Sequence, residues 1–159
     1  MSIFKNILQI LEESDISYKL IEHEPVFTME QAAQVCNHLP KQGVKTLLIK
    51  LYATKRQFEY RLIVWQGNEQ MPFAEICSKL DFKKCKLAQP QEVADELGIE
   101  VGALSPFGCA KQYPVIFDKR LLEQKQVFIN AGVHDKTIAF APEDLFKIVA
   151  KSSSQCIQF

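Results

Sequence analysis

The sequence predicts an α+β fold, in which a mixed, mainly antiparallel β-sheet or a partly closed barrel is surrounded by helices. Amphipathic helical segments alternate along the chain with short runs rich in β-branched and aromatic residues. The length of 159 residues and the hydrophobic content of 47% are typical of one globular domain with one core. Because no repeat, linker or low-complexity segment divides the chain, residues 1–159 are expected to form a single domain.

The N-terminal region predicts two helices with a strand between them. Apolar residues recur at helical spacing after Ser2, a good N-cap residue, and predict an amphipathic helix over residues 3–14. Residues 17–21 form a short apolar run before a proline-containing break and predict a strand. Thr28, followed three positions later by Gln31, gives a capping-box pattern that begins a second helix.

The central region predicts a β-hairpin followed by two short helices. Residues 44–52 and 58–65 are rich in β-branched and aromatic residues and are separated by a polar segment, which is typical of an antiparallel hairpin. Helices are expected at residues 72–80 and 90–97, with a short strand at 84–88 between them. Pro90 at the first position and Gly98 beyond the last bound the second of these helices.

The C-terminal region predicts three strands and a closing helix. Residues 102–108, GALSPFG, are expected to be irregular because neither a helix nor a strand tolerates two glycines and a proline so close together. Strands are expected at residues 113–117, 126–129 and 137–140, and a helix at 142–150. The final segment, SSSQCIQF, is expected to be loosely ordered.

The charge balance limits how this protein could bind nucleic acid. The formal net charge is zero, so the molecule lacks the basic excess of proteins that bind many phosphates. No DNA partner is expected, and any RNA contact must be local. Lysines cluster over residues 79–86 and near the turn of the expected hairpin, at Lys50, Lys55 and Arg56. Such clusters are also common on ordinary solvated surfaces.

The cysteines and histidines give no sign of a metal site or of a disulfide framework. Five cysteines, an odd number, are scattered without a CxxC pair, which is typical of reduced thiols. The three histidines lack metal-ligand spacing, so neither a metal nor a cofactor is expected. Without a run of about 18 apolar residues or a secretory signal, no membrane partner is expected, and the protein should be cytoplasmic.

Lys45 is the most unusual charged residue in the pattern, because it begins an otherwise apolar strand. Burying an isolated ammonium ion is costly. Lys45 therefore either reaches solvent through its long stem or faces an anionic or polarised ligand in a cleft. The pattern alone favours the first interpretation.

Two glycine-bearing segments offer further candidate sites. In residues 102–108, glycines let backbone N–H groups approach a ligand closely, as an oxyanion or phosphate site requires, although such a composition usually marks only a turn. The Asn-Ala-Gly turn at 130–132 lies beside His134 and Asp135. A histidine next to an aspartate suggests a general base with a charged partner. Adjacent side chains on an extended segment point apart, however, so a surface turn is the simpler interpretation.

Six pieces of sequence occur in a fixed order along nearly the whole chain. They are Tyr18, HEPVFT at 23–28, VKTLLIK at 44–50, GALSP at 102–106, NAG at 130–132 and APEDL at 141–145. Taken together, they resemble the YbaK and prolyl-tRNA-synthetase-associated editing family. The resemblance implies that family's fold and an aminoacyl-tRNA deacylase, which removes a wrongly attached amino acid, often from tRNA for proline. No synthetase module accompanies the chain, which implies the trans-acting form.

The resemblance also implies site residues. The family's lysine corresponds to Lys45, and its Gly-x-x-x-Pro loop corresponds to Gly102 and Pro106, with Ser105 inside the loop. The substrate-binding positions correspond to Tyr18, Phe27, Thr46, Asn130, Gly132 and Thr137. Many relatives have a Gly-Lys-Arg-Gly turn where this chain has Gly-Val-His-Asp at 132–135, which weakens any assignment of substrate by subfamily.

The implied reaction needs little chemistry from the protein, because an aminoacyl ester on a ribose is labile and the neighbouring hydroxyl can help to activate water. Backbone N–H groups of residues 102–105 would stabilise the oxyanion. Lys45 would hold the terminal phosphate or polarise the ester. Phe27 and its apolar neighbours would admit a small side chain such as that of Ala or Cys. The expected partner is the aminoacylated 3′ end of tRNA, with prolyl-tRNA synthetase as a candidate docking partner.

Two other interpretations stay open at this point. The protein could bind aminoacyl-tRNA or a synthetase without hydrolysing anything, although Lys45 and the glycine loop argue against this. It could also be a thiol-dependent hydrolase that uses Cys36 or Cys109, although no motif marks either cysteine as activated. The sequence does not specify the amino acid, the tRNA or the oligomeric state.

Overall fold

Helices and short strands alternate along the chain in the computed structural model, which describes residues 2–159. The helices within this range are α1 (Ile3–Glu13), α2 (Met29–Val35), α3 (Phe73–Lys79), α4 (Pro90–Leu97) and α5 (Pro142–Ser152), with 3-10 helices η1 (Pro40–Gln42), η2 (Val101–Ala103) and η3 (Lys119–Glu123). The strands are β1 (Lys19–Glu22), β2 (Val44–Tyr52), β3 (Phe58–Gln66), β4 (Lys84–Leu87), β5 (Val115–Phe117), β6 (Val127–Asn130), β7 (Lys136–Phe140) and β8 (Cys156–Gln158).

The helix ends follow the local signals in the sequence. The Ser2 hydroxyl accepts a hydrogen bond from the Lys5 N–H at 3.1 Å and caps α1. Thr28 and Gln31 form the predicted capping box at the start of α2. Gly98 ends α4 with a φ of 70°, a left-handed conformation that glycine adopts without strain.

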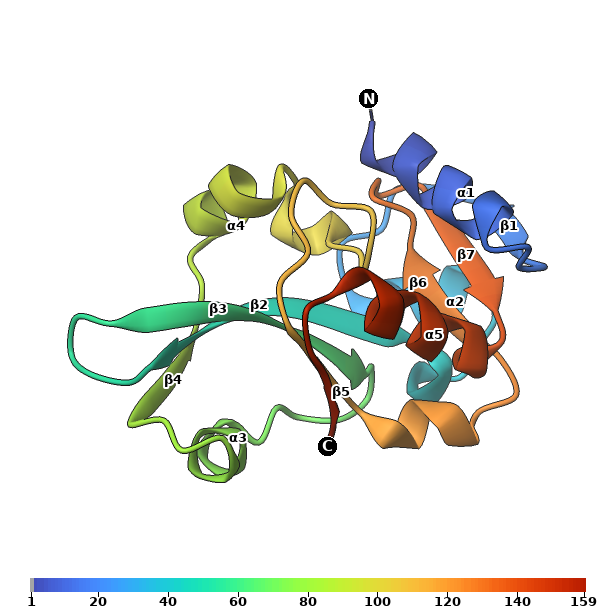
Figure 1. The fold of residues 1–159 in the computed structure, drawn as a ribbon. Helices are drawn as coiled ribbons and strands as arrows, with labels where there is room; N and C mark the ends of the chain where they lie inside the picture. Colours follow the sequence, from blue (N-terminus) through green and yellow to red (C-terminus); the bar gives the residue numbers. More distant parts are fainter. Residues whose placement is uncertain (1) are drawn as a thin grey trace.

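The strands form two separate sheets. One has the order β1-β7-β6 and is antiparallel throughout. The other has the order β4-β2-β3-β5-β8, with antiparallel pairing among β4, β2 and β3 and parallel pairing from β3 to β8. The α+β prediction is confirmed, and the sheets do not close into a barrel. In Figure 1 the long β2–β3 hairpin extends to the left, with α4 on one side and α3 on the other.

The two sheets meet through one short contact and share the main hydrophobic core. A single parallel bridge joins Gly43, just before β2, to Phe128 in β6. The main core includes fully buried residues from α1, both sheets and α5, such as Ile7, Leu62 and Leu145. A smaller apolar cluster on the other face of the five-stranded sheet lies under α3. No helix within residues 2–159 is both long and apolar enough to span a bilayer.

The prediction of a loosely ordered C-terminal segment is wrong. Residues 156–158 form β8, which pairs in parallel with β5 at the edge of the larger sheet. Phe159 then packs on Trp65, with ring centroids 5.7 Å apart, and joins the smaller apolar cluster. The sequence does not predict this strand because residues 152–155 before it are polar and only Ile157 and Phe159 give an alternating apolar pattern.

Candidate active site

Five of the predicted site residues line one hollow of about 180 Å³. They come from four distant parts of the chain and are Phe27, Lys45, Thr46, Gly102 and Asn130. The rest of the lining is mainly apolar: Val26, Thr28, Met29, Ala32, Val44, Leu47, Val101 and Leu104. The hollow therefore has an apolar wall with a few polar groups, which is the usual composition of a small-molecule site.

The bridge between the sheets explains why Lys45 and Asn130 meet. Gly43 and Phe128 are paired in parallel, so the positions two residues further along both strands also lie side by side. Those positions are Lys45 in β2 and Asn130 at the end of β6. The start of β2, in the five-stranded sheet, thus lies beside the end of β6, in the three-stranded sheet.

Two glycines let the start of α2 pack closely over this strand end. A Cβ atom added at Gly67 would lie 2.8 Å from the Pro40 carbonyl oxygen and 2.9 Å from the Met29 side chain. A Cβ atom added at Gly43 would also clash with the Met29 sulfur atom. The absence of side chains at both positions lets Met29 and the adjoining Phe27 segment cover the hollow.

Lys45 lies partly buried in this apolar setting. Its Nζ donates a hydrogen bond to the Glu69 carbonyl oxygen at 2.6 Å. Burial lowers the pKa of Lys45 from its ordinary value, and the charges of Glu30 and Glu69 partly oppose this. An ammonium group has three donors, so two remain for an anionic or carbonyl-bearing ligand.

Two N–H groups of the glycine loop that were expected to face a ligand are already used within the protein. The Ala103 and Leu104 N–H groups already donate to the carbonyls of Glu100 and Val101, at 3.0 and 3.3 Å. Within residues 2–159 the Gly102 N–H has no such acceptor, and Gly102 lines the hollow. Gly102 therefore combines a place in the lining of the hollow with a backbone N–H that is free to bind a ligand.

Ser105 and Pro106 lie behind the loop, outside the lining of the hollow. Ser105 is fully buried, and its carbonyl accepts a weak hydrogen bond from the Cys109 thiol. Pro106 is buried as well, and its carbonyl accepts a hydrogen bond from the Gln112 side chain. Both residues are thus buried on the side of the loop away from the hollow's lining.

Tyr18, Gly132 and Thr137 are also outside this hollow. Tyr18 packs against the main core. The Thr137 hydroxyl lies 2.8 Å from Nε2 of His23 and so joins β7 to the segment that leads to Phe27. Gly132, with a φ of 82°, lines a neighbouring hollow of about 410 Å³.

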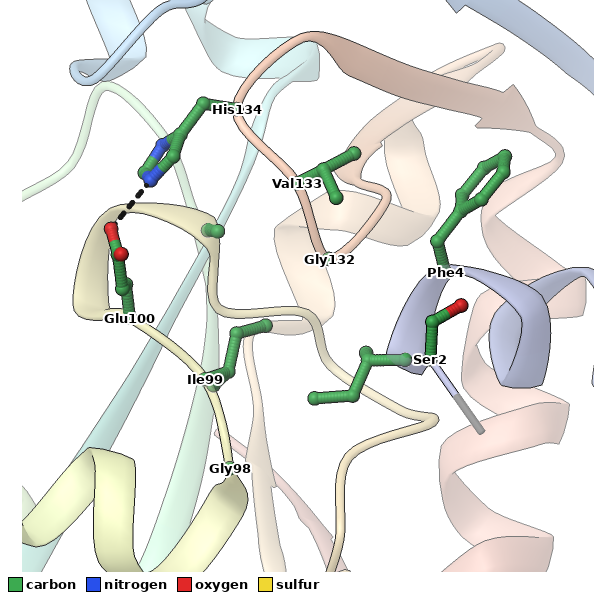
Figure 2. A pocket seen from close by; sticks show the side chains of 10 residues that line it. Ser2, Phe4, Gly98, Ile99, Glu100, Gly132, Val133 and His134 are labelled. Atoms are coloured by element: carbon green, nitrogen blue, oxygen red, sulfur yellow. Dashed lines mark hydrogen bonds and ion pairs between the residues drawn. The ribbon is translucent and has the colours of Figure 1, made fainter.

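His134 is a site neighbour that sequence reasoning set aside as part of a surface turn. Figure 2 shows it beside the 410 Å³ hollow, paired with Glu100, while Asp135 pairs with Lys136. Its Nε2 lies 2.9 Å from the Glu100 carboxylate, and its ring lies 4.5 Å from the ring of Phe27. A Cβ atom at Gly102 would lie 3.1 Å from its Cε1. His134 thus contacts both Phe27 and the glycine loop.

Comparison with known proteins supplies the family. Residues 23–148 match the family described as the aminoacyl-tRNA editing domain. The chain belongs to the aminoacyl-tRNA editing domain family. The resemblance inferred from the sequence is confirmed, and with it the class of enzyme, an aminoacyl-tRNA deacylase.

Relatives in this editing family match the chain over most of its length. Prolyl-tRNA editing protein ProX of Acetoanaerobium sticklandii is 27% identical over 147 residues, which are 90% of this chain and 88% of that protein. Multifunctional Ser/Thr-tRNA deacylase ProXp-y of Escherichia coli K12 is 23% identical over 145 residues, 91% of this chain and 86% of that protein. A solved structure described as a candidate trans-editing enzyme for prolyl tRNA synthetase superposes with a TM-score of 0.80 at 20% identity, covering 98% of this chain and 96% of that one, and shows the same fold.

The cysteines of this editing protein give no support to thiol chemistry at the site. Burial raises the pKa of Cys109 to about 11, so its thiol stays protonated at neutral pH. Cys109 also borders a different hollow, beside α1. Cys36 ends α2 and does not line the hollow that contains Lys45. Within residues 2–159, no group of three or more His, Cys, Asp or Glu residues could hold a metal ion.

Proposed function

We propose that this protein is a trans-acting hydrolase that removes a small, wrongly attached amino acid, such as Ala or Cys, from tRNA for proline. The observation that carries the proposal is the 180 Å³ hollow that Lys45, Phe27, Gly102 and Asn130 share. Pockets for drug-sized ligands measure roughly 300–1,000 Å³, so this one suits an aminoacyl group with a small side chain.

The proposed reaction is attack of water on the ester carbon, with release of the free amino acid and the 3′ end of the tRNA. The ribose hydroxyl next to the ester orients the water and relays a proton from it to the departing ribose oxygen. Lys45 uses the donors that Glu69 leaves free to bind the terminal phosphate or the ester carbonyl. The Gly102 N–H stabilises the oxyanion, a contribution worth about 3 kcal/mol for a well-placed donor.

The remaining predicted residues act by positioning in this proposal. Ser105 and Pro106 fix the glycine loop to the core. Thr137 holds His23 and the segment that carries Phe27. Tyr18 and Gly132 shape the elements next to the site without lining it.

A second candidate substrate is a hydroxyl-bearing amino acid, such as serine. Thr46 lines the hollow, and its hydroxyl is buried with no hydrogen-bond partner within residues 2–159. Leaving such a group unpaired is costly, and a substrate hydroxyl would pair with it. One of the matched relatives is named a Ser/Thr-tRNA deacylase.

The test is hydrolysis of tRNAs charged with Ala, Cys, Ser or Thr by the purified protein. Lys45→Ala is expected to lose about 100-fold in kcat/KM for the best substrate, as for the loss of one electrostatic contact in an active site. Lys147→Ala, which removes an exposed charge from α5, is the matched control and should retain full activity.

The same assay separates the enzyme from a module that only binds charged tRNA. Loss of ester from none of the four tRNAs above the spontaneous rate would contradict the proposal and favour the binding role. Because burial lowers the pKa of Lys45, its charged form does not stabilise the fold, and Lys45→Ala is expected to keep the melting temperature of the wild type.

A further inference from the structure

A lysine-rich hollow lies at the opposite end of β2 from the candidate active site. It has a volume of about 380 Å³ and is lined by Tyr52, Thr54, Lys55, Lys83, Lys84 and Lys86. These residues come from the β2–β3 turn and from the segment around β4, so the two lysine clusters of the sequence meet at one place. The structure thus concentrates positive charge locally in a chain of zero net charge.

None of the four lysines around this hollow forms an ion pair with any residue in the range 2–159. By contrast, nearby Lys50 is paired with Glu92 at 2.9 Å. Like charges that gather without counter-charges repel one another, so this arrangement favours the binding of a polyanion. Tyr52 adds an aromatic ring, with Lys86 Nζ 5.5 Å from its centroid.

A third hollow adjoins the candidate active site and has one lining residue, Leu87, next in sequence to the lysine-rich hollow. This apolar hollow has a volume of about 270 Å³ and includes Leu87 and Pro90. It shares Leu47, Val101 and Leu104 with the candidate active site. Leu87, which is 45% exposed, directly follows Lys86 in the chain.

Strand register places Lys84 and Lys86 on the side of the sheet that carries α4. Lys50 of β2 donates a hydrogen bond to Glu92 of α4. In the antiparallel pairing of β2 with β4, Lys50 lies opposite Lys86. Tyr52, two residues further along β2, faces the same side and is paired with Lys84. The 270 Å³ apolar hollow includes Pro90 and Val93 of α4 and is therefore on this side as well.

We propose that this surface binds the acceptor arm of the tRNA whose 3′ end enters the candidate active site. The proposal rests on the proposed function and adds where the RNA lies. Lys55, Lys83, Lys84 and Lys86 bind backbone phosphates. Unstacked bases contact the exposed apolar side chains of Leu87 and Val101 in the apolar hollow. Lys45 and Tyr52 lie roughly 23 Å apart along β2 at about 3.3 Å per residue, which is about seven nucleotides at 3.4 Å each.

The test compares two triple variants on two substrates. Lys83→Gln, Lys84→Gln and Lys86→Gln together remove three charges from the hollow. Lys125→Gln, Lys147→Gln and Lys151→Gln remove three exposed charges elsewhere and serve as the matched control. One substrate is the charged tRNA that the wild type hydrolyses fastest among Ala-, Cys-, Ser- and Thr-tRNA. The other is the same amino acid on the 3′-hydroxyl of adenosine, which lacks the acceptor arm.

The first triple variant is expected to raise KM for the charged tRNA at least tenfold. It should also reduce the slope of log KM against log salt by about 2, because each phosphate contact contributes about 0.7 to 0.9. Its rate on the aminoacyl-adenosine should equal that of the wild type. The control triple variant should change none of these quantities.

The outcomes separate this inference from the proposed function. Equal KM and salt slopes for the two triple variants would overturn the RNA-binding surface while leaving the hydrolase intact. An equal loss on aminoacyl-adenosine would also overturn it, because the lysines would then act on the active site or on folding. If the wild type hydrolysed neither substrate, the proposed function itself would fail.

Discussion

At the scale of single residues, the site depends on close contact between Gly102 and His134. The pattern alone favoured a solvent-reaching Lys45 and an ordinary turn at the glycine loop, and both were assigned to the site only through the resemblance to the editing family. Sequence reasoning could not find the contact of His134 with Phe27 and Glu100, since that contact joins residues far apart in the chain. The sequence also could not show that Ser105 and Pro106 face the core while Gly102 faces the hollow.

Gly102→Ala tests this contact. The added Cβ would lie 3.1 Å from the His134 ring, so the ring or the loop must shift by a few tenths of an ångström. We expect kcat/KM for the charged tRNA to fall about tenfold, measured by loss of ester. When His134→Ala is also present, Gly102→Ala should reduce kcat/KM by a smaller factor than it does in the otherwise wild-type protein. Additive losses would show that the two residues do not interact.

At the scale of elements, the position of α4 is fixed by a polar cluster on the β2–β3 hairpin. The Glu92 carboxylate accepts hydrogen bonds from Lys50 and from the Tyr60 hydroxyl, both at 2.9 Å, and from the Gln89 N–H at 2.8 Å. The sequence predicted α4 and the hairpin separately from caps and β-branched runs. Their docking was not predictable, because it depends on three-dimensional pairing of charges that are ordinary in the sequence.

This cluster makes stability depend on pH in the acid range. The hydrogen bonds from the Gln89 N–H and from Lys50 lower the pKa of Glu92 to about 2, below the ordinary value of 4.5. A carboxyl group with a lowered pKa stabilises the fold above its unfolded pKa and loses that contribution as pH falls from about 4.5 to about 2. Glu92→Gln should therefore lower the free energy of unfolding by about 1–2 kcal/mol at pH 7, after allowance for solvent screening.

Urea unfolding at several pH values measures this effect. The difference between wild type and Glu92→Gln should shrink as pH falls and vanish near pH 2. A difference that stays constant across this range would show that the substitution acts through packing rather than through the charge. Asp95→Gln, on the exposed side of α4, is a suitable control for the change of charge.

At the scale of the whole molecule, the C-terminal strand completes the larger sheet and the second apolar cluster. The helix caps and the hairpin were predictable because their signals are local. The division into two sheets and the order β3-β5-β8 were not, because parallel pairing joins segments far apart in the chain without a sequence signature. Strand β8 was not predicted for the same reason, because it pairs in parallel with the distant β5 and has few apolar residues.

Phe159→Ala tests the role of the C-terminal segment in the whole fold. The ring packs on Trp65 and beside the buried Ile63 and Ile116 cluster, so its loss should cost about 1–2 kcal/mol. For a chain of this size, that loss lowers the melting temperature by roughly 2–8 °C. The hydrolysis rate at 25 °C should not change. An unchanged melting temperature would show that the Phe159 ring contributes nothing to stability.

The central claim is that the small hollow beside Lys45 binds the aminoacyl group. A crystal structure with a non-hydrolysable analogue, 3′-alanylamino-3′-deoxyadenosine, tests it most directly. The account predicts that the alanyl group lies between Lys45 Nζ and the Gly102 N–H, beneath the ring of Phe27. An alanyl group bound instead in the larger hollow beside Gly132 and His134 (Figure 2), with the space near Lys45 empty, would contradict it.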